Sequence, residues 1–232
     1  MNITELLPRL HLLTLGAYQA YLWVDGGAAT LIDTGARGSG PAIAEGLRRI
    51  GLDTGAVARV VLTHFHDDHV GSAAEVAAWN GMSVVAHVND APVIRGERVG
   101  PSPNFADEER TLHAQVAAGL EGAPPVRVDR TVVDGDVLDF GGGAQVISTP
   151  GHTDGSIALY LPQHGVLFTG DVVAHHQGSV IPGVFNLDRD QVVASFRRLA
   201  ELDARVVCFG HGAPLRHDGR TRMREAAACL DR

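Results

Sequence analysis

The chain contains no lysine, and all 19 of its basic residues are arginine. Without lysine it cannot form a Schiff base through a side-chain amine, and it cannot supply the lysine of a phosphate-binding P-loop. Cysteine is nearly absent, because only Cys208 and Cys229 occur, and this excludes a disulfide framework. No apolar run reaches transmembrane length, and the N-terminus lacks the basic and apolar regions of a signal peptide. We therefore expect a cytoplasmic protein.

Basic residues are also fewer than acidic ones, 19 against 27, so the chain carries a net charge of −8. This balance argues against nucleic acid or an anionic membrane as the main partner and leaves a small-molecule substrate as the expectation. A length of 232 residues with 45% hydrophobic residues is enough for a sizeable core. We expect a single domain over residues 1–232.

What the chain does have is a dense group of ligand-type side chains in Thr63–Gly71, read T-H-F-H-D-D-H-V-G. The group follows an apolar run that predicts a buried strand. Residues two apart do not face one another on a helix, so His64 and His66 share a metal only if the backbone turns after the strand. Imidazoles with a carboxylate are ligands of zinc and related divalent metals. Asp68 and His69 are adjacent to each other and would serve a second metal close by.

The rest of the chain predicts strands and helices in alternation. An antiparallel meander is expected to open the fold, with an Asp-Gly turn at Asp25-Gly26-Gly27. Segment 87–125 reads either as a lid or wall of a pocket or as a surface insertion. The expected strands are residues 9–15, 19–24, 29–32, 57–62, 82–86, 126–128, 131–133, 137–140, 144–148, 156–161 and 165–168. The expected helices are residues 41–50, 72–80 with a capping box at Ser72, 87–94, 106–120 and 189–202.

Three further motifs each follow a predicted strand, and the strand ahead of the third motif is expected to end just before Cys208. They are T-P-G-H-T-D-G from Thr149, T-G-D from Thr169 and G-H-G from Gly210. In this order, and together with the H-x-H-x-D-H of the first group, they resemble the metallo-β-lactamase superfamily. The resemblance runs from Leu31 to Gly212 and implies an α/β fold. That fold is an αββα four-layer sandwich, in which two mixed β-sheets are flanked by helices.

The resemblance also implies a metal centre with two divalent ions about 3.5–4 Å apart. It assigns His64, His66 and His152 to the first ion and Asp68, His69 and His211 to the second, with Asp171 bridging both. Asp33 would lie under the site and orient the ligands. Zinc is expected, with iron or manganese as alternatives. A hydroxide formed at the centre would attack a carbonyl, and Asp68 would be the catalytic acid–base group.

Departures from known branches narrow the expected activity. Class B1 β-lactamases have cysteine where Asp171 stands, and acyl-homoserine lactonases have a pocket tyrosine where Ala174 stands. We therefore expect a binuclear metal-dependent hydrolase of the glyoxalase II-like branch that cleaves a small ester, lactone or thioester. The expected pocket residues are Phe105, His175, His176, Ile181 and Phe185.

Several alternatives stay open at this point. One is an oxidoreductase with a single iron, similar to the persulfide dioxygenases, which share the T-P-G-H-T-D-G motif. Others are a β-lactam-hydrolysing enzyme and a binding module with an inert site. The sequence leaves open whether the protein is a monomer or a dimer.

Overall fold

The computed structural model describes residues 2–230, and within them the chain divides into two compact units. The first unit contains the residues up to Gly100 together with Gly119–Val132. The second contains Pro101–Ala118 together with the residues from Val133 onward. Neither unit is therefore a single continuous stretch of chain.

The first unit is built on a seven-stranded sheet whose strands lie side by side in sequence order. The first four strands form an antiparallel meander, whereas β4 to β7 run parallel. The strands are β1 (Asn2–Leu7), β2 (Leu10–Leu15), β3 (Tyr18–Asp25), β4 (Ala28–Ile32), β5 (Val57–Val61), β6 (Ser83–His87) and β7 (Arg130–Val132). The helices are α1 (Gly40–Arg49), the 3-10 helix η1 (Thr54–Ala56), α2 (Asp67–Val70), α3 (Ala73–Ala77) and α4 (Ala91–Ile94).

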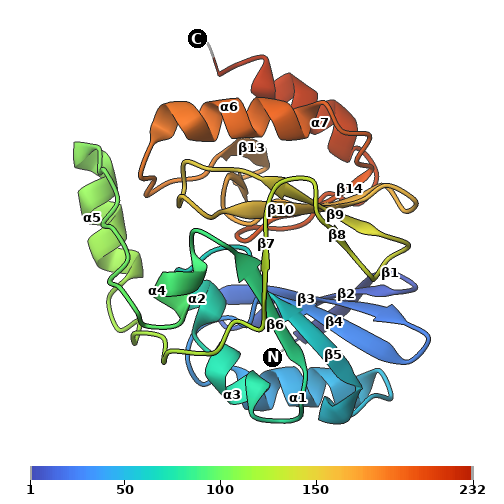
Figure 1. Ribbon diagram of the computed structural model, residues 1–232. Helices are drawn as coiled ribbons and strands as arrows, with labels where there is room; N and C mark the ends of the chain where they lie inside the picture. Colours follow the sequence, from blue (N-terminus) through green and yellow to red (C-terminus); the bar gives the residue numbers. More distant parts are fainter. Residues whose placement is uncertain (1, 231–232) are drawn as a thin grey trace. The chain divides into compact units, whose positions relative to one another are not determined.

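Local sequence explains how these elements begin and end. The turn between β3 and β4 uses Gly26 and Gly27 with φ of 56° and 91°, a conformation that glycine adopts without steric cost. Helix α1 begins with Pro41 in its first turn and carries two arginines in its last turn, where they complement the helix dipole. Its buried Ile43 and Leu47 pack with strand residues in one core. Burying each such side chain contributes roughly 1.5–3 kcal/mol. Figure 1 shows α1 and α3 along the same face of the sheet.

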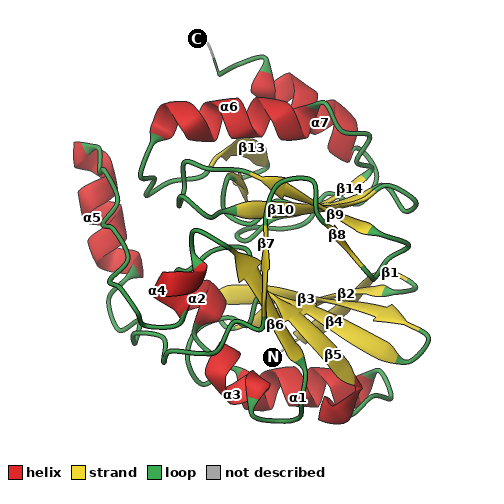
Figure 2. Cartoon of the chain, in the orientation of Figure 1, coloured by secondary structure: helices red, strands yellow, loops and turns green. Residues whose placement is uncertain are grey.

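The second unit contains a five-stranded sheet in the order β14-β11-β10-β9-β8 and a separate hairpin of β12 and β13. Helices α6 and α7 cover one face of this sheet (Figures 1 and 2). Phe196 of α6 and Met223 of α7 belong to the core of this unit, together with Leu167 and Val207 of the sheet. The strands are β8 (Val137–Leu138), β9 (Ala144–Ser148), β10 (Ile157–Leu161), β11 (Val166–Phe168), β12 (Val173–His176), β13 (Ser179–Pro182) and β14 (Val206–Cys208). The helices are α5 (Asp107–Val116), α6 (Arg189–Ala200) and α7 (Gly219–Ala227).

The structure corrects several local predictions. Residues 126–128 are not a strand, because the Val126 N–H bonds to the carbonyl of Ile94 at the end of α4. The predicted helix over residues 87–94 begins only at Ala91, since His87 ends β6. The capping box at Ser72 is wrong. The Ser72 hydroxyl instead donates to the Ala36 carbonyl and accepts from the Ser39 N–H, each at 2.7 Å. The sequence patterns do not predict strands β1, β12 and β13, the short helices η1 and α2, or helix α7.

Candidate metal centre

The first unit delivers its ligand-type side chains at the carboxyl ends of parallel strands. Asp33 directly follows β4, and the loop from Thr63 follows β5 beside it. Since parallel strands end at the same sheet edge, these residues meet there. After an extended stretch the chain enters α2, which begins at Asp67 and contains Asp68 and His69. The backbone turn that the motif requires is thus a short helix.

Asp33 fixes the geometry of this loop. Its carboxylate accepts hydrogen bonds from the Thr63 N–H at 2.8 Å, the Thr63 hydroxyl at 2.8 Å and His69 Nδ1 at 2.9 Å. Its backbone has φ of 59°, which is uncommon for a non-glycine residue. The N–H of Asp33 donates to the Val61 carbonyl and so keeps the turn against β5. Asp33 therefore fixes the positions of Thr63 and His69, and its role under a metal site stays a prediction.

These hydrogen bonds also determine how the imidazoles are protonated. A carboxylate only accepts, so His69 must carry its hydrogen on Nδ1 and keep the lone pair on Nε2. The Thr63 hydroxyl donates to Asp33, so its oxygen can accept from His64 Nδ1, which lies 3.0 Å away. His64 therefore also presents the lone pair of Nε2. A hydrogen bond at Nδ1 fixes the tautomer and the ring orientation, and so leaves Nε2 able to bind a metal.

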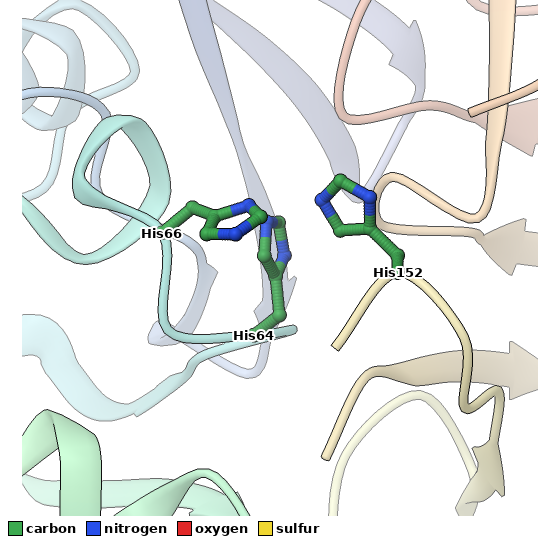
Figure 3. A group of neighbouring side chains, drawn as sticks. All are labelled: His64, His66 and His152. Carbon is green, nitrogen blue, oxygen red and sulfur yellow. The ribbon is translucent and has the colours of Figure 1, made fainter. Parts of the chain in front are cut away.

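The remaining groups of this loop divide into ligand-type and structural residues. The ring centroid of His64 lies 4.7 Å from that of His66 (Figure 3) and 4.1 Å from that of His69. Asp68 Oδ2 lies 3.8 Å from His69 Nε2. Asp67, in contrast, accepts a 2.7 Å hydrogen bond from the Ala123 N–H. Of the two adjacent aspartates, one therefore ties the loop to residues 119–132, and the other lies beside the imidazoles.

The second unit places its three candidate ligands at the ends of strands that run in one direction. Strand β11 is parallel to β14, and β10 is antiparallel to both β9 and β11. His152 follows β9, Asp171 follows β11 and His211 follows β14. Asp171 Oδ2 lies 3.1 Å from His211 Nε2 and 3.7 Å from His152 Nε2. The His152 and Asp171 side chains are largely buried, whereas that of His211 is 42% exposed.

Asn186 is a contact residue of this site that the sequence analysis did not identify. The side-chain oxygen of this buried asparagine lies 3.0 Å from His152 Nδ1. The available signal was weak: a lone polar residue in the run V-F-N-L ahead of α6. The sequence does not identify Thr63 either, because a threonine directly before the first histidine is not part of the H-x-H-x-D-H motif.

The predicted pocket residues divide into two groups. Phe105 and Phe185 meet with ring centroids 6.1 Å apart, and His113 of α5 contacts both, at 4.6 and 5.0 Å. We call these three residues the aromatic group. Ile181 and His176 share one face of the β12–β13 hairpin, whereas His175 and its partner Val180 share the other.

His175 is engaged in contacts that hold the hairpin in place. Its Nδ1 donates to the Ala213 carbonyl at 2.6 Å, and its ring packs on Phe209. Arg222 of α7 lies against its Nε2 and donates to the Gly178 carbonyl. His175 therefore lies on the opposite face of the hairpin from His176 and Ile181, and the pocket role of the five residues stays a prediction.

The donor chemistry fits a divalent metal. His64, His66, Asp68 and His69 of the first unit, and His152, Asp171 and His211 of the second, all belong to groups of His and Asp side chains that could hold a metal ion. Figure 3 draws three of them, His64 and His66 from the loop after β5 and His152 from the loop after β9.

Comparison with known proteins assigns the family. The model of the metallo-β-lactamase superfamily matches residues 13–211, so the chain belongs to this superfamily. The fold is the expected mixed α/β type. A solved metallo-β-lactamase family protein from Thermus thermophilus is similar, with a TM-score of 0.70 and 28% identity over 97% of this chain and 80% of that one.

Some of the curated relatives carry named activities. An acyl-coenzyme A thioesterase from Gallus gallus, MBLAC2, is 34% identical over 61% of this chain and 50% of its own length. A hydroxyacylglutathione hydrolase from Rhodospirillum rubrum is 28% identical over 80% of this chain and 57% of its own length. The chain thus spans only half to three fifths of these two enzymes. Family and relatives support a metal-dependent hydrolase in general. Within residues 2–230, no helix combines the length and apolar character needed to cross a membrane.

Proposed function

We propose that the protein is a binuclear metal-dependent hydrolase of small acyl substrates and that one domain over residues 1–232 carries the activity. We expect both ions to be zinc. The assignment is His64, His66 and His152 for one ion, Asp68, His69 and His211 for the other, and Asp171 for both. It is supported by the ordered motifs and by the family model, which runs through both units.

One observation carries the proposal. His64, His69 and His152 are all buried, and each has a hydrogen-bond partner at Nδ1. If these three histidines served only in packing, nothing would require each of them to have its Nδ1 hydrogen-bonded and its Nε2 lone pair available. Metal-ligating histidines do have this need, because the partner at the other nitrogen fixes both the tautomer and the orientation of the ring.

The side chains of this protein would supply binding, orientation and proton transfer. Divalent metals, when bound, lower the pKa of water toward about 7 and polarise a carbonyl. Asp33 would hold His69 in place. Asp68 would accept a proton on its carboxylate and return it to the leaving group.

We propose an ester, lactone or thioester as the substrate class. One curated relative is named an acyl-coenzyme A thioesterase and another a hydroxyacylglutathione hydrolase, and the aromatic group offers an apolar surface to an acyl chain. A net charge of −8 supports a small-molecule partner rather than nucleic acid or an anionic membrane. A cytoplasmic location and either a monomer or a dimer are part of the same proposal.

The test combines metal analysis of the purified protein with a substrate panel. The panel contains acyl-coenzyme A and acylglutathione thioesters, lactones, simple esters, a penicillin and a carbapenem. We expect up to two zinc-type ions per chain, turnover of at least one thioester, lactone or ester, and slow or absent β-lactam cleavage.

Three outcomes would overturn the proposal. If the purified protein contains no metal, and added zinc, manganese or iron produces no activity, the protein is a binding module. One iron per chain with oxygen consumption on glutathione persulfide would make it a dioxygenase. Efficient β-lactam cleavage would make it a β-lactamase.

A further inference from the structure

The buried side chain of Asn186 has only one orientation that satisfies its neighbours. Its amide nitrogen donates a 2.7 Å hydrogen bond to the Gly183 carbonyl, which can only accept. The amide oxygen must therefore face His152 Nδ1 at 3.0 Å. Because that oxygen is an acceptor, the hydrogen of His152 lies on Nδ1 and the lone pair on Nε2, the nitrogen nearer Asp171.

The backbone around Asn186 is tied to both loops that carry candidate ligands. The Gly183 N–H donates to the Val172 carbonyl at 3.0 Å, and a Cβ on Gly183 would lie 1.7 Å from the carbonyl oxygen of Asp171. On the other side, the N–H of Asp188 donates to the Gly151 carbonyl at 2.9 Å. The short segment from Gly183 to Asp188 therefore spans the loops of Asp171 and His152.

The same segment is joined to the aromatic group. The Asn104 N–H donates to the carbonyl of Asn186 at 2.8 Å, which places Phe105 beside Phe185. Phe185 itself has φ of 60°, a conformation unusual for a bulky residue and one that the surrounding contacts must maintain. Asn186 thus contacts a candidate ligand through its side chain and the aromatic group through its backbone.

We propose that Asn186 is the positioning residue of His152 and that it links the aromatic group to the ligand. Only an amide fits this place, because it donates to one neighbour and accepts from the other. A carboxylate would face the Gly183 carbonyl without a proton. Leucine, of similar size, would leave both the carbonyl and the imidazole without this partner. The inference rests on the proposed function, since it takes His152 to be a metal ligand.

The test measures metal affinity rather than turnover. Apo protein is titrated with Zn²⁺ and with Co²⁺, whose visible spectrum reports histidine ligation. We expect Asn186→Leu to weaken one binding event by about 10–100-fold, the usual effect of removing such a partner, and to alter the cobalt spectrum. Asn186→Asp keeps the acceptor oxygen, so it should recover part of the affinity.

The matched control is Asn80→Leu. Asn80 donates to the Thr54 carbonyl at 3.1 Å and accepts from the Met82 N–H at 2.9 Å, and neither partner is a candidate ligand. Denaturant unfolding of the apo proteins should show a loss of stability in both leucine variants, but only Asn186→Leu should lose metal affinity.

The outcomes separate the two proposals. Wild-type protein that binds no metal would defeat the proposed function itself. Wild-type protein that binds metal while Asn186→Leu binds it equally well, with the same cobalt spectrum, would overturn only the positioning role. An equal loss of affinity in both leucine variants would also overturn it, because a general structural effect would then suffice.

Discussion

Single side chains carry several roles in this protein, and Asp33 is the clearest example. One carboxylate accepts two hydrogen bonds from Thr63 and one from His69. Charge-assisted hydrogen bonds of this kind are about twice as strong as neutral ones. The unusual backbone angle of Asp33 is compatible with them, because aspartate tolerates the left-handed region better than most residues do. A single residue thereby sets the ring orientation of His69 directly and that of His64 through Thr63.

At this scale we predict that Asp68→Asn lowers turnover by about 10²–10⁴, the range for loss of a general acid–base group. The amide keeps the shape of the side chain but lacks the negative charge and the basic oxygen. Metal at the second site should weaken, whereas His64, His66 and His152 should still hold the first ion. Kinetics and elemental analysis on the same preparation check both parts.

The neighbouring Asp67 provides the control for this prediction. Asp67→Asn changes the same charge in the same turn of α2, but the side chain of Asp67 bonds to the Ala123 N–H. It should affect stability more than metal content or rate. Near wild-type turnover and full metal content in Asp68→Asn would show that Asp68 is only a turn residue.

Among the elements, the loop after β9 and the beginning of α6 are interlocked. Gly151 has φ of 125°, and a Cβ there would lie 2.4 Å from the backbone nitrogen of Val192. The Ser195 hydroxyl of α6 donates to the Pro150 carbonyl at 2.8 Å. The glycine of the P-G-H-T motif is therefore required by helix packing next to His152. A substitution that destabilises the N-terminus of α6 should therefore change the conformation of the loop that carries His152.

That N-terminus gives a pH-dependent prediction. Asp188 caps α6, and hydrogen bonds from the backbone and then the side chain of Gln191 lower the pKa of its carboxyl below the usual value. A carboxyl with a lowered folded-state pKa stabilises the fold above the unfolded-state pKa of about 3.9 and loses this contribution as the pH falls through the folded-state value. In metal-free protein, Asp188→Ala should therefore lower the melting temperature at pH 7, and the difference from wild type should shrink below about pH 4.

Thermal unfolding at a series of pH values, with chelator present throughout, measures this effect. Asp190→Ala is the control, because Asp190 lies in the first turn of α6 but is not the capping residue. A difference between wild type and Asp188→Ala that stays constant down to pH 3 would exclude the cap as its source.

For the whole molecule we predict that metal removal costs both activity and stability. A ligand that binds only the folded state stabilises it by about 2.7 kcal/mol at 100 times its Kd. Chelation should therefore abolish turnover and lower the melting temperature, and added zinc should restore both. Scanning fluorimetry with and without chelator measures the change. Identical melting curves, with activity retained, would contradict a resident metal.

Sequence patterns predicted most of the sheet strands because their apolar periodicity reflects burial. They failed where tertiary contacts decide the structure. Strand β1 contains Thr4 and Glu5 and lies at a sheet edge, so its pattern is weak. The β12–β13 turn uses Gln177 and Gly178, both with positive φ, and glutamine is not a usual residue for such a turn. Helix α7 buries little besides Met223.

In the candidate site, too, local motifs could be predicted from the sequence, whereas residues that depend on tertiary contacts could not. The ligand-type residues could be named in advance because their motifs are local and follow strand ends. Thr63 and Asn186 could not, because each acts through a neighbour brought in by folding. The Thr63 hydroxyl beside His64 is oriented by Asp33, 30 residues away, and the partner of His152 is Asn186, 34 residues away.

The discontinuous path of the chain has a consequence for protein synthesis. Strand β6 pairs with β7 through Val85 and Arg130, but residues 101–118, which lie between them, belong to the other unit. At about 5–20 residues per second, a growing chain displays an open β6 edge for a few seconds before β7 emerges. An unpaired strand edge invites aggregation. Substitutions that delay the docking of β7 should therefore reduce the yield of folded protein from the ribosome, even when the finished protein is as stable as the wild type.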